Sequence, residues 1–136
     1  MILLLDDEID LVAPFKLLLE KQGFSVSGFT EPLLALEHFQ INRDKYRLVI
    51  SDLRMPGMNG FEFVKKIKEL KPEVKVFFMT AFEIDDIEFK RLLPSVKIDE
   101  FIQKPCSVKS LIAAITKHMD IGIKPKRDSS NDLKLD

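Results

Sequence analysis

The change from strand to helix is clearest at residues 48–60, which are Leu48-Val-Ile-Ser-Asp52-Leu-Arg-Met-Pro-Gly-Met-Asn-Gly60. A short apolar run predicts a buried strand, an acid stands where that strand ends, and Pro and Gly mark a loop before a helix begins near position 60. A buried strand followed by a loop and a helix is the building unit of an α/β fold.

The same alternation extends along the chain in both directions. Apolar runs predict strands at 2–5, 24–29, 48–51, 74–79 and 98–102. Apolar residues three and four apart predict helices at 10–22, 30–41, 60–70, 83–93 and 107–119. Pro14 is compatible with the helix at 10–22 only in its first turn. Strict alternation with doubly buried strands favours a parallel sheet between helices, a three-layer α/β/α sandwich.

Length and composition limit what this chain can be. It has 136 residues, 46% of them hydrophobic, and a formal net charge of −1. These values predict one core and favour neither nucleic acid nor a membrane as a partner. The first five residues lack the basic flank and length of a signal peptide, and Cys106 is the single cysteine. We expect a cytoplasmic protein with one domain at 1–119 and a flexible tail or truncated linker at 120–136.

Polar residues close four of the predicted strands, namely Asp6 with Asp7, Asp52, Thr80, and Lys104 with Pro105. The carboxyl ends of parallel strands meet at one edge, so three carboxylates, a hydroxyl and an ammonium should converge there. Mg²⁺ prefers carboxylate oxygens, which Asp7 and Asp52 would supply. A carboxylate held near cations can also accept a phosphoryl group.

Each of these features also has a purely structural explanation. Asp6 and Asp7 are equally compatible with a solvated acidic turn, and Thr80 with a helix cap. Lys104-Pro105 alone carries little information, although proline there raises the chance of a cis peptide bond. Cys106 is either a redox group or a small buried thiol. Only the combination of residues in this order indicates phosphoryl chemistry.

The combination resembles the receiver domain of two-component response regulators, of the single-domain type found in chemotaxis regulators. The resemblance is carried by Asp6-Asp7-Glu8, Asp52-Leu-Arg-Met-Pro-Gly-Met-Asn-Gly60, Thr80-Ala81 and Phe101-Ile-Gln-Lys104-Pro105. It covers residues 2–119 and implies a flavodoxin-like, five-stranded parallel sheet of order 2-1-3-4-5.

The resemblance also implies a role for each residue of the site. Asp52 would be the phosphoacceptor, and Thr80 and Lys104 would contact the phosphoryl oxygens. Phe101 matches the aromatic that turns inward when Thr80 moves toward the phosphate. The implied cofactor is Mg²⁺, for which Mn²⁺ can substitute. Its implied ligands are Asp7, Asp52, the backbone carbonyl of Arg54, and Asp6 through a water.

The implied partners are proteins. A sensor histidine kinase or phosphotransfer protein would donate the phosphoryl group, docking near the first helix and the loop after Lys104. An unknown downstream effector would bind the fourth helix, fifth strand and fifth helix, and a phosphorylation-dependent homodimer is a further option. The resemblance implies no direct nucleic-acid or membrane binding. The domain would catalyse its own phosphorylation and dephosphorylation, without acting as an enzyme on an external metabolite.

Two alternative functions stay open, and residues at two places in the chain leave details of a receiver domain open. Aspartate-nucleophile phosphohydrolases use similar groups, but they carry a second Asp where this chain has Glu8. A degenerate receiver would bind partners without phosphorylation. Residues 92–97 replace the Gly-Ala pair common in the family, which leaves the geometry of the fourth helix open. The bulky Arg54 and Phe82 predict slow dephosphorylation.

Overall fold

A computed structural model of the protein describes residues 1–53, 55–81 and 96–119. Five strands form one sheet in the order β2-β1-β3-β4-β5, and every neighbouring pair is parallel. The strands are β1 (Ile2–Leu5), β2 (Val26–Phe29), β3 (Leu48–Asp52), β4 (Lys75–Thr80) and β5 (Glu100–Gln103). The predicted strand order is confirmed.

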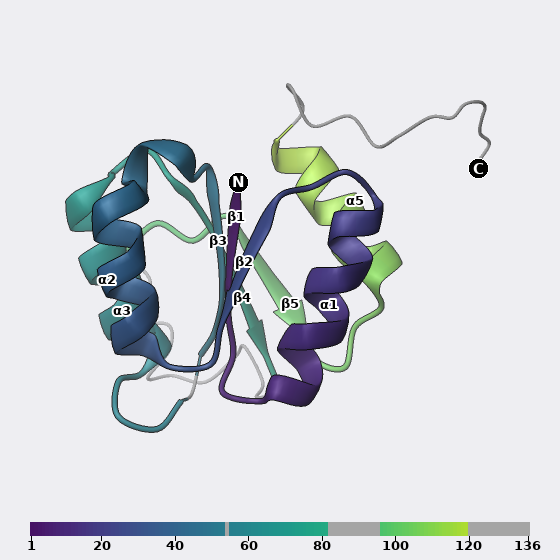
Figure 1. The fold of residues 1–136 in the computed structure, drawn as a ribbon, viewed down its shortest axis with the longest axis horizontal. Coiled ribbons are helices and arrows are strands. Elements are labelled where there is room, and N and C mark those ends of the chain that lie inside the picture. The colour runs from purple at the N-terminus through teal and green to yellow at the C-terminus, as the bar shows by residue number, and fades with distance from the viewer. Residues whose placement is uncertain (54, 82–95, 120–136) are drawn as a thin grey trace.

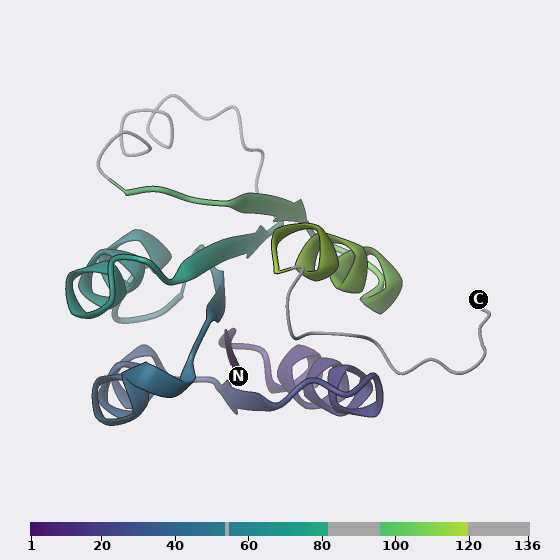
Figure 2. The ribbon, with the colours of Figure 1, turned by 90° about the horizontal axis from the view of Figure 1, so that it is seen from above.

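Helices cover both faces of this sheet. Figure 1 shows α1 (Ile9–Lys21) and α5 (Val108–His118) on one side, with α2 (Pro32–Asn42) and α3 (Gly60–Leu70) on the other. A 3₁₀ turn, η1 (Arg43–Lys45), follows α2. The view from above shows the same three layers, so the predicted α/β/α sandwich is confirmed (Figure 2). The helix predicted at 83–93 and the tail predicted at 120–136 lie outside the described residues.

The core consists of two apolar clusters, one on each face of the sheet. Successive side chains of a strand point to opposite faces. In β1, Leu3 and Leu5 therefore join the cluster under α2 and α3, while Ile2 and Leu4 join the cluster under α1 and α5. A strand buried on both faces needs apolar residues at every position, which explains the uninterrupted runs in the sequence.

Side-chain caps fix where two helices begin after their strands. The Asn59 side chain accepts a hydrogen bond from the Glu62 backbone N–H at 2.9 Å, and the Glu62 carboxylate accepts one from the Asn59 N–H at 3.3 Å. Ser107 accepts a hydrogen bond from the Ser110 N–H at the start of α5. These capping interactions anchor the ends of the loops that follow β3 and β5.

The expected position of Pro14 is wrong. Since α1 begins at Ile9, Pro14 lies in the second turn of the helix and not in the first. There it cannot donate a hydrogen bond to the carbonyl of Asp10. Both residues are exposed, so water can replace the missing donor and the helix continues to Lys21.

Candidate functional site

Strand register brings the polar strand ends together at the carboxyl edge of the sheet. Leu5 pairs with Ser51, Asp52 with Met79, and Thr80 with Gln103. Asp6 follows the first of these strands directly, and Lys104 follows the last. The convergence that parallel topology predicted for these residues is therefore present in the structure.

Three carboxylates form the acidic part of this edge. Asp6, Asp7 and Asp52 each offer an oxygen, and these oxygens all lie within 4.8 Å of one another. Asp6 and Asp52 are buried, whereas Asp7 is exposed. Backbone amides hold one oxygen of each buried acid: Glu8 N–H donates to Asp6 Oδ1 at 2.9 Å, and Leu53 N–H donates to Asp52 Oδ1 at 2.8 Å.

Lys104 faces the other oxygens of the two buried acids. Its Nζ lies 2.6 Å from Asp6 Oδ2 and 3.5 Å from Asp52 Oδ2, with Glu8 Oε1 at 3.8 Å. Burial alone would lower the pKa of Lys104, but its hydrogen bond to Asp6 and the charges of Asp6, Asp52 and Glu8 raise it. The ammonium is therefore firmly charged. The Lys104–Pro105 peptide bond is cis, the geometry whose chance the proline raises.

Asp52 titrates far from the usual range of an aspartate. Burial raises its pKa to about 6, and the negative charges of Asp6 and Asp7 add to this effect. Lys104 and the Leu53 N–H act in the opposite direction. Burial and the neighbouring acids thus disfavour the charged form of Asp52, and an additional cation would favour it.

The residues present fit a hard divalent cation. Asp6 Oδ2 is buried, and among the described residues its partner is the Lys104 ammonium alone, at 2.6 Å. Three carboxylates facing one ammonium also leave uncompensated negative charge. Carboxylate oxygens with this charge are the ligands that Mg²⁺ prefers. The further ligand implied at the Arg54 carbonyl lies outside the described residues.

Thr80 and Phe101 lie on the strands beside this cluster. Thr80 ends β4 and is fully buried, and its carbonyl accepts the Lys104 N–H at 2.7 Å. Phe101 is half-buried on β5, with its ring centroid 6.0 Å from that of Phe78. Phe78 in turn meets Phe61 of α3 edge to face at 5.2 Å. Three aromatic rings therefore link β5 through β4 to α3.

The sequence interpretation missed the importance of Gly60. Its N–H donates to the Leu53 carbonyl at 2.7 Å, and a Cβ at position 60 would overlap the Asp52 carbonyl oxygen. Only glycine lets α3 begin this close to the backbone of Asp52. A glycine directly after the capping residue Asn59 was the available signal.

Cys106 follows the cis peptide bond and is half-buried. Burial raises the pKa of its thiol, with a smaller opposing effect from the Lys104 charge. A raised pKa leaves little thiolate at neutral pH, which favours packing over redox chemistry as the role of Cys106.

Comparison with known families identifies the family of this chain. Residues 2–116 match the family model of the response regulator receiver domain. The chain belongs to this family. Receiver domains are generally signalling domains and in general bind Mg²⁺, with which the acidic cluster of Asp6, Asp7 and Asp52 is compatible.

Curated relatives of this receiver domain include longer and equally short proteins. It is 33% identical over 130 residues to the Transcriptional regulatory protein CpxR homolog of Haemophilus influenzae, covering 96% of this chain and 55% of the relative. It is 28% identical over 116 residues to the Response regulator receiver protein CpdR of Brucella abortus, covering 85% of this chain and 93% of the relative. The chain spans about half the length of the CpxR homolog and of several other curated relatives.

Solved structures show the same fold. A response regulator receiver domain protein from Clostridium thermocellum superimposes with a TM-score of 0.78 at 27% identity, covering 88% of this chain and 93% of that one. A CheY-like receiver domain protein from Methanospirillum hungatei gives the same TM-score at 25% identity, with coverages of 88% and 92%. Across residues 1–53, 55–81 and 96–119, no helix has the length and apolar character needed to cross a bilayer.

Proposed function

We propose that this receiver domain accepts a phosphoryl group on Asp52 in a Mg²⁺-dependent reaction. The observation that supports this most is the placement of Asp52 Oδ2, 3.5 Å from the Lys104 ammonium and beside the oxygens of Asp6 and Asp7. The donor is a phosphohistidine on a sensor histidine kinase or phosphotransfer protein. A carboxylate oxygen of Asp52 attacks phosphorus, the bond from phosphorus to the donor nitrogen breaks, and an acyl phosphate forms.

Each residue around Asp52 has a separate role in the proposed phosphoryl transfer. The Leu53 N–H holds Oδ1, which leaves Oδ2 as the attacking oxygen. Asp7 and Asp52, with Asp6 through a water, would hold Mg²⁺, which would supply positive charge for the oxygens of the transferred group. Lys104 leaves Asp6 and contacts a phosphoryl oxygen, while the Thr80 hydroxyl donates to another. Mn²⁺ is expected to replace Mg²⁺, because both prefer oxygen ligands.

The output is a shift between two conformations of the domain. Once Thr80 and Lys104 follow the phosphoryl group, Phe101 turns inward and the surface formed by β5, α5 and the helix predicted at 83–93 changes. The ring contact between Phe101 and Phe78 supports a connection of this surface to the core. An unidentified effector protein, or a second copy of the domain, then binds that surface.

The donor protein docks beside α1 and the loop after Lys104. Ile9, the first residue of α1, is 59% exposed close to the acidic cluster, which supports a protein contact there. We place the receiver domain at residues 1–119, with a tail or linker from 120, in the cytoplasm. Slow dephosphorylation through Arg54 and Phe82 stays a prediction, because both residues lie outside the described part of the chain.

The proposal is tested by incubating the protein with Mg²⁺ and acetyl phosphate and measuring its intact mass. One hydroxylamine-labile phosphoryl group is expected, and Asp52→Asn should remove it. Asp10→Asn is the matched control, because Asp10 is an exposed acid outside the cluster. Stoichiometric labelling of folded Asp52→Asn refutes the acceptor assignment. Repeated turnover of a small phosphate ester would support a phosphohydrolase instead.

A further inference from the structure

The outward side of α2 is apolar, whereas that of the neighbouring helix α3 is charged. Leu33, Leu34 and Ile41 of α2 have exposed fractions of 67%, 51% and 78%. A helix that covers a sheet normally turns polar residues toward solvent. α3 follows this rule, since its exposed residues are Glu62, Lys65, Lys66 and Glu69. The exposed apolar side chains of α2 therefore indicate a contact surface.

The exposed apolar residues form one stripe along α2. Successive residues of a helix are about 100° apart, so Leu33, Leu34 and Ile41 fall within about a third of its circumference, with the exposed Glu37 among them. We name these four residues the α2 stripe. The inner side of α2 is apolar too, with Phe39 fully buried in the core under the helix. A helix that is apolar on both sides is typical of a buried position, so we expect a protein surface to cover the stripe.

The two ends of α2 carry opposite charges. The helix begins directly after the exposed Glu31, at the edge of the sheet that bears the acidic cluster. It ends in η1, which consists of the exposed residues Arg43, Asp44 and Lys45 and so has a net positive charge. A partner that fits this surface should therefore present a positive region near Glu31 and a negative region near η1.

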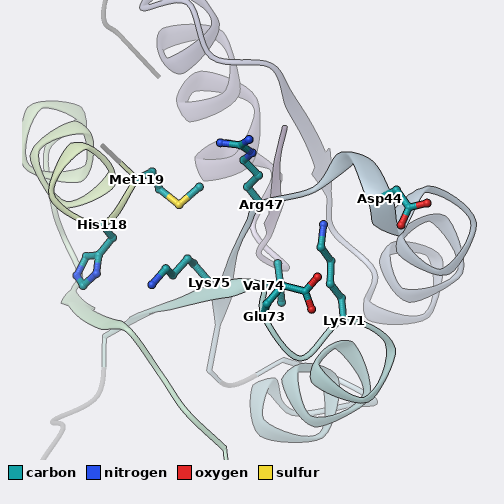
Figure 3. Close-up of a pocket in the computed structure, with 8 residues that line it drawn as sticks. All are labelled: Asp44, Arg47, Lys71, Glu73, Val74, Lys75, His118 and Met119. Atoms are coloured by element: carbon teal, nitrogen blue, oxygen red, sulfur yellow. The ribbon is translucent and has the colours of Figure 1, made fainter. Parts of the chain in front are cut away.

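Other cations lie beside the η1 end of α2. The Met1 ammonium donates to the Lys45 carbonyl at 3.1 Å. The Lys71 ammonium donates to the Arg43 carbonyl at 2.9 Å, and Figure 3 shows its side chain extending from the end of α3 toward this turn. Burial lowers the pKa of the Met1 ammonium, and the charges of Arg47 and Lys71 lower it further. These cations outnumber the acids that line the pocket at this edge, Asp44 and Glu73.

We propose that α2 is the contact surface for a second copy of this chain, with the two α2 helices packed antiparallel around a twofold axis. In this arrangement the acidic end of each helix lies beside the positive end of the other, and the match occurs twice. The apolar side chains of each stripe are removed from water by those of the other. An unrelated partner would have to carry the same pattern of charge independently, which is why the opposite ends of α2 favour a second copy.

The register of the pair follows from the sequence of α2. Around a twofold axis, residues that face each other have numbers with a constant sum. Placing Leu34 opposite Ile41 of the partner subunit leaves Glu31 within one residue of the position opposite Lys45 of the partner subunit. The same register brings the two Glu37 carboxylates close to the axis, where their like charges oppose pairing. Removing the charge of Glu37 should therefore strengthen the dimer.

The interface is small and leaves the phosphorylation site open. α2 has 11 residues and is about 16 Å long, so a pair of such helices lies at the low end of interface areas and predicts a dissociation constant in the micromolar range. α2 packs over β1 and β2, on the opposite side of the sheet from α1 and α5 (Figure 1). Asp52 and the surface of β5 and α5 therefore stay accessible, and the dimer is independent of the proposed phosphorylation.

The test is sedimentation equilibrium of the full chain at about 10–500 µM without Mg²⁺ or a phosphodonor. A reversible equilibrium between monomer and dimer is expected. Leu34→Gln and Ile41→Gln should each raise the dissociation constant by about tenfold, and Glu37→Gln should lower it by about threefold. Leu17→Gln is the matched control, because Leu17 is 54% exposed on α1, at the other side of the sheet.

Exchanging charges tests the antiparallel arrangement. Glu31→Lys and Lys45→Glu should each weaken the dimer by about threefold, because each brings like charges together at both ends of the pair. The variant that carries both substitutions should regain the affinity of the parent. Circular dichroism shows whether each variant is folded, and the substituted residues are all exposed.

Four results would overturn the proposal. A chain that stays monomeric at the highest concentration would leave the α2 stripe to a different protein. Equal losses in Leu17→Gln and Leu34→Gln would show general apolar association. A dimer that forms only after phosphorylation would belong to the surface of β5 and α5. A double charge variant as weak as the single variants would contradict the antiparallel packing.

Discussion

Gly60 lies directly against the backbone carbonyl of Asp52, with no space for a side chain between them. The hydrogen bond from Gly60 N–H to the Leu53 carbonyl, 2.7 Å long, closes the loop that follows Asp52. The start of α3 therefore supports the backbone from which the Asp52 carboxylate projects. A change at position 60 should move the carboxylate as well as the helix.

Gly60→Ala should lower the stability of the fold by about 1–3 kcal/mol, because the overlap outweighs the better helix propensity of alanine. It should also slow labelling of Asp52 by acetyl phosphate. Gly23→Ala is the control: Gly23 has a φ of +99°, so alanine strains the backbone there, far from Asp52. Urea denaturation and labelling rates check both effects. Equal labelling rates for the two variants would contradict the supporting role of Gly60.

Asp52 should make stability depend on pH in Mg²⁺-free solution. Its pKa is raised to about 6 from the ordinary aspartate value of 3.8, so the folded state binds the proton more tightly than the unfolded state. The stability that protonated Asp52 provides is full below pH 4 and is lost as the pH rises through 6. Asp52→Asn should therefore be more stable than the parent by about 2–3 kcal/mol at pH 8, with little difference at pH 4.

Urea denaturation of both proteins from pH 4 to pH 8 in the presence of a chelator measures this difference. A constant difference across that range would show that Asp52 titrates normally. The chain with Asp10→Asn should follow the parent at every pH, because this exposed acid lies outside the cluster.

Lys104→Ala should destabilise the fold and make it depend on Mg²⁺. The substitution leaves the buried Asp6 Oδ2 without its ammonium at 2.6 Å, and losing one partner of a buried pair costs about 3 kcal/mol or more. A divalent cation replaces part of the lost charge, so Mg²⁺ should raise the melting temperature of Lys104→Ala more than that of the parent. Lys66→Ala should respond like the parent. An equal Mg²⁺ effect in all three proteins would argue against a cation beside Asp6.

Asp7→Asn should weaken Mg²⁺ binding by roughly tenfold, which corresponds to about 1.4 kcal/mol for the loss of one charged ligand. Asp7 is the exposed member of the cluster, so its substitution should leave the fold intact. Binding should also weaken as the pH falls below 6, because Asp52 becomes protonated. Isothermal titration calorimetry at pH 5 and pH 8 measures both effects. An unchanged affinity in Asp7→Asn would exclude Asp7 as a ligand.

Much of this architecture could be predicted from local patterns. Each observed strand and helix begins and ends within about two residues of its predicted position, because buried strands need apolar runs and helices need apolar stripes. Parallel topology then places strand ends at one edge, so the meeting of Asp6, Asp52 and Lys104 followed from the strand order.

Contacts that depend on the packing of distant segments could not be predicted in this way. His38 of α2 is half-buried, and its Nε2 forms a hydrogen bond of 2.6 Å with the Tyr46 hydroxyl. The Lys68 ammonium of α3 donates to the Val74 carbonyl at 2.6 Å. Whether the Lys104 ammonium lies closer to Asp6 or to Asp52 likewise depends on tertiary distances. Hydrophobic periodicity contains no information about these distances.

The most direct measurement of the central claim identifies the labelled residue. After incubation with Mg²⁺ and acetyl phosphate, reduction with borohydride converts an aspartyl phosphate to homoserine, and peptide mass spectrometry locates it in the chain. We predict homoserine at position 52 alone, and none without Mg²⁺. Homoserine at Asp6 or Asp7 with residue 52 unmodified would contradict the account.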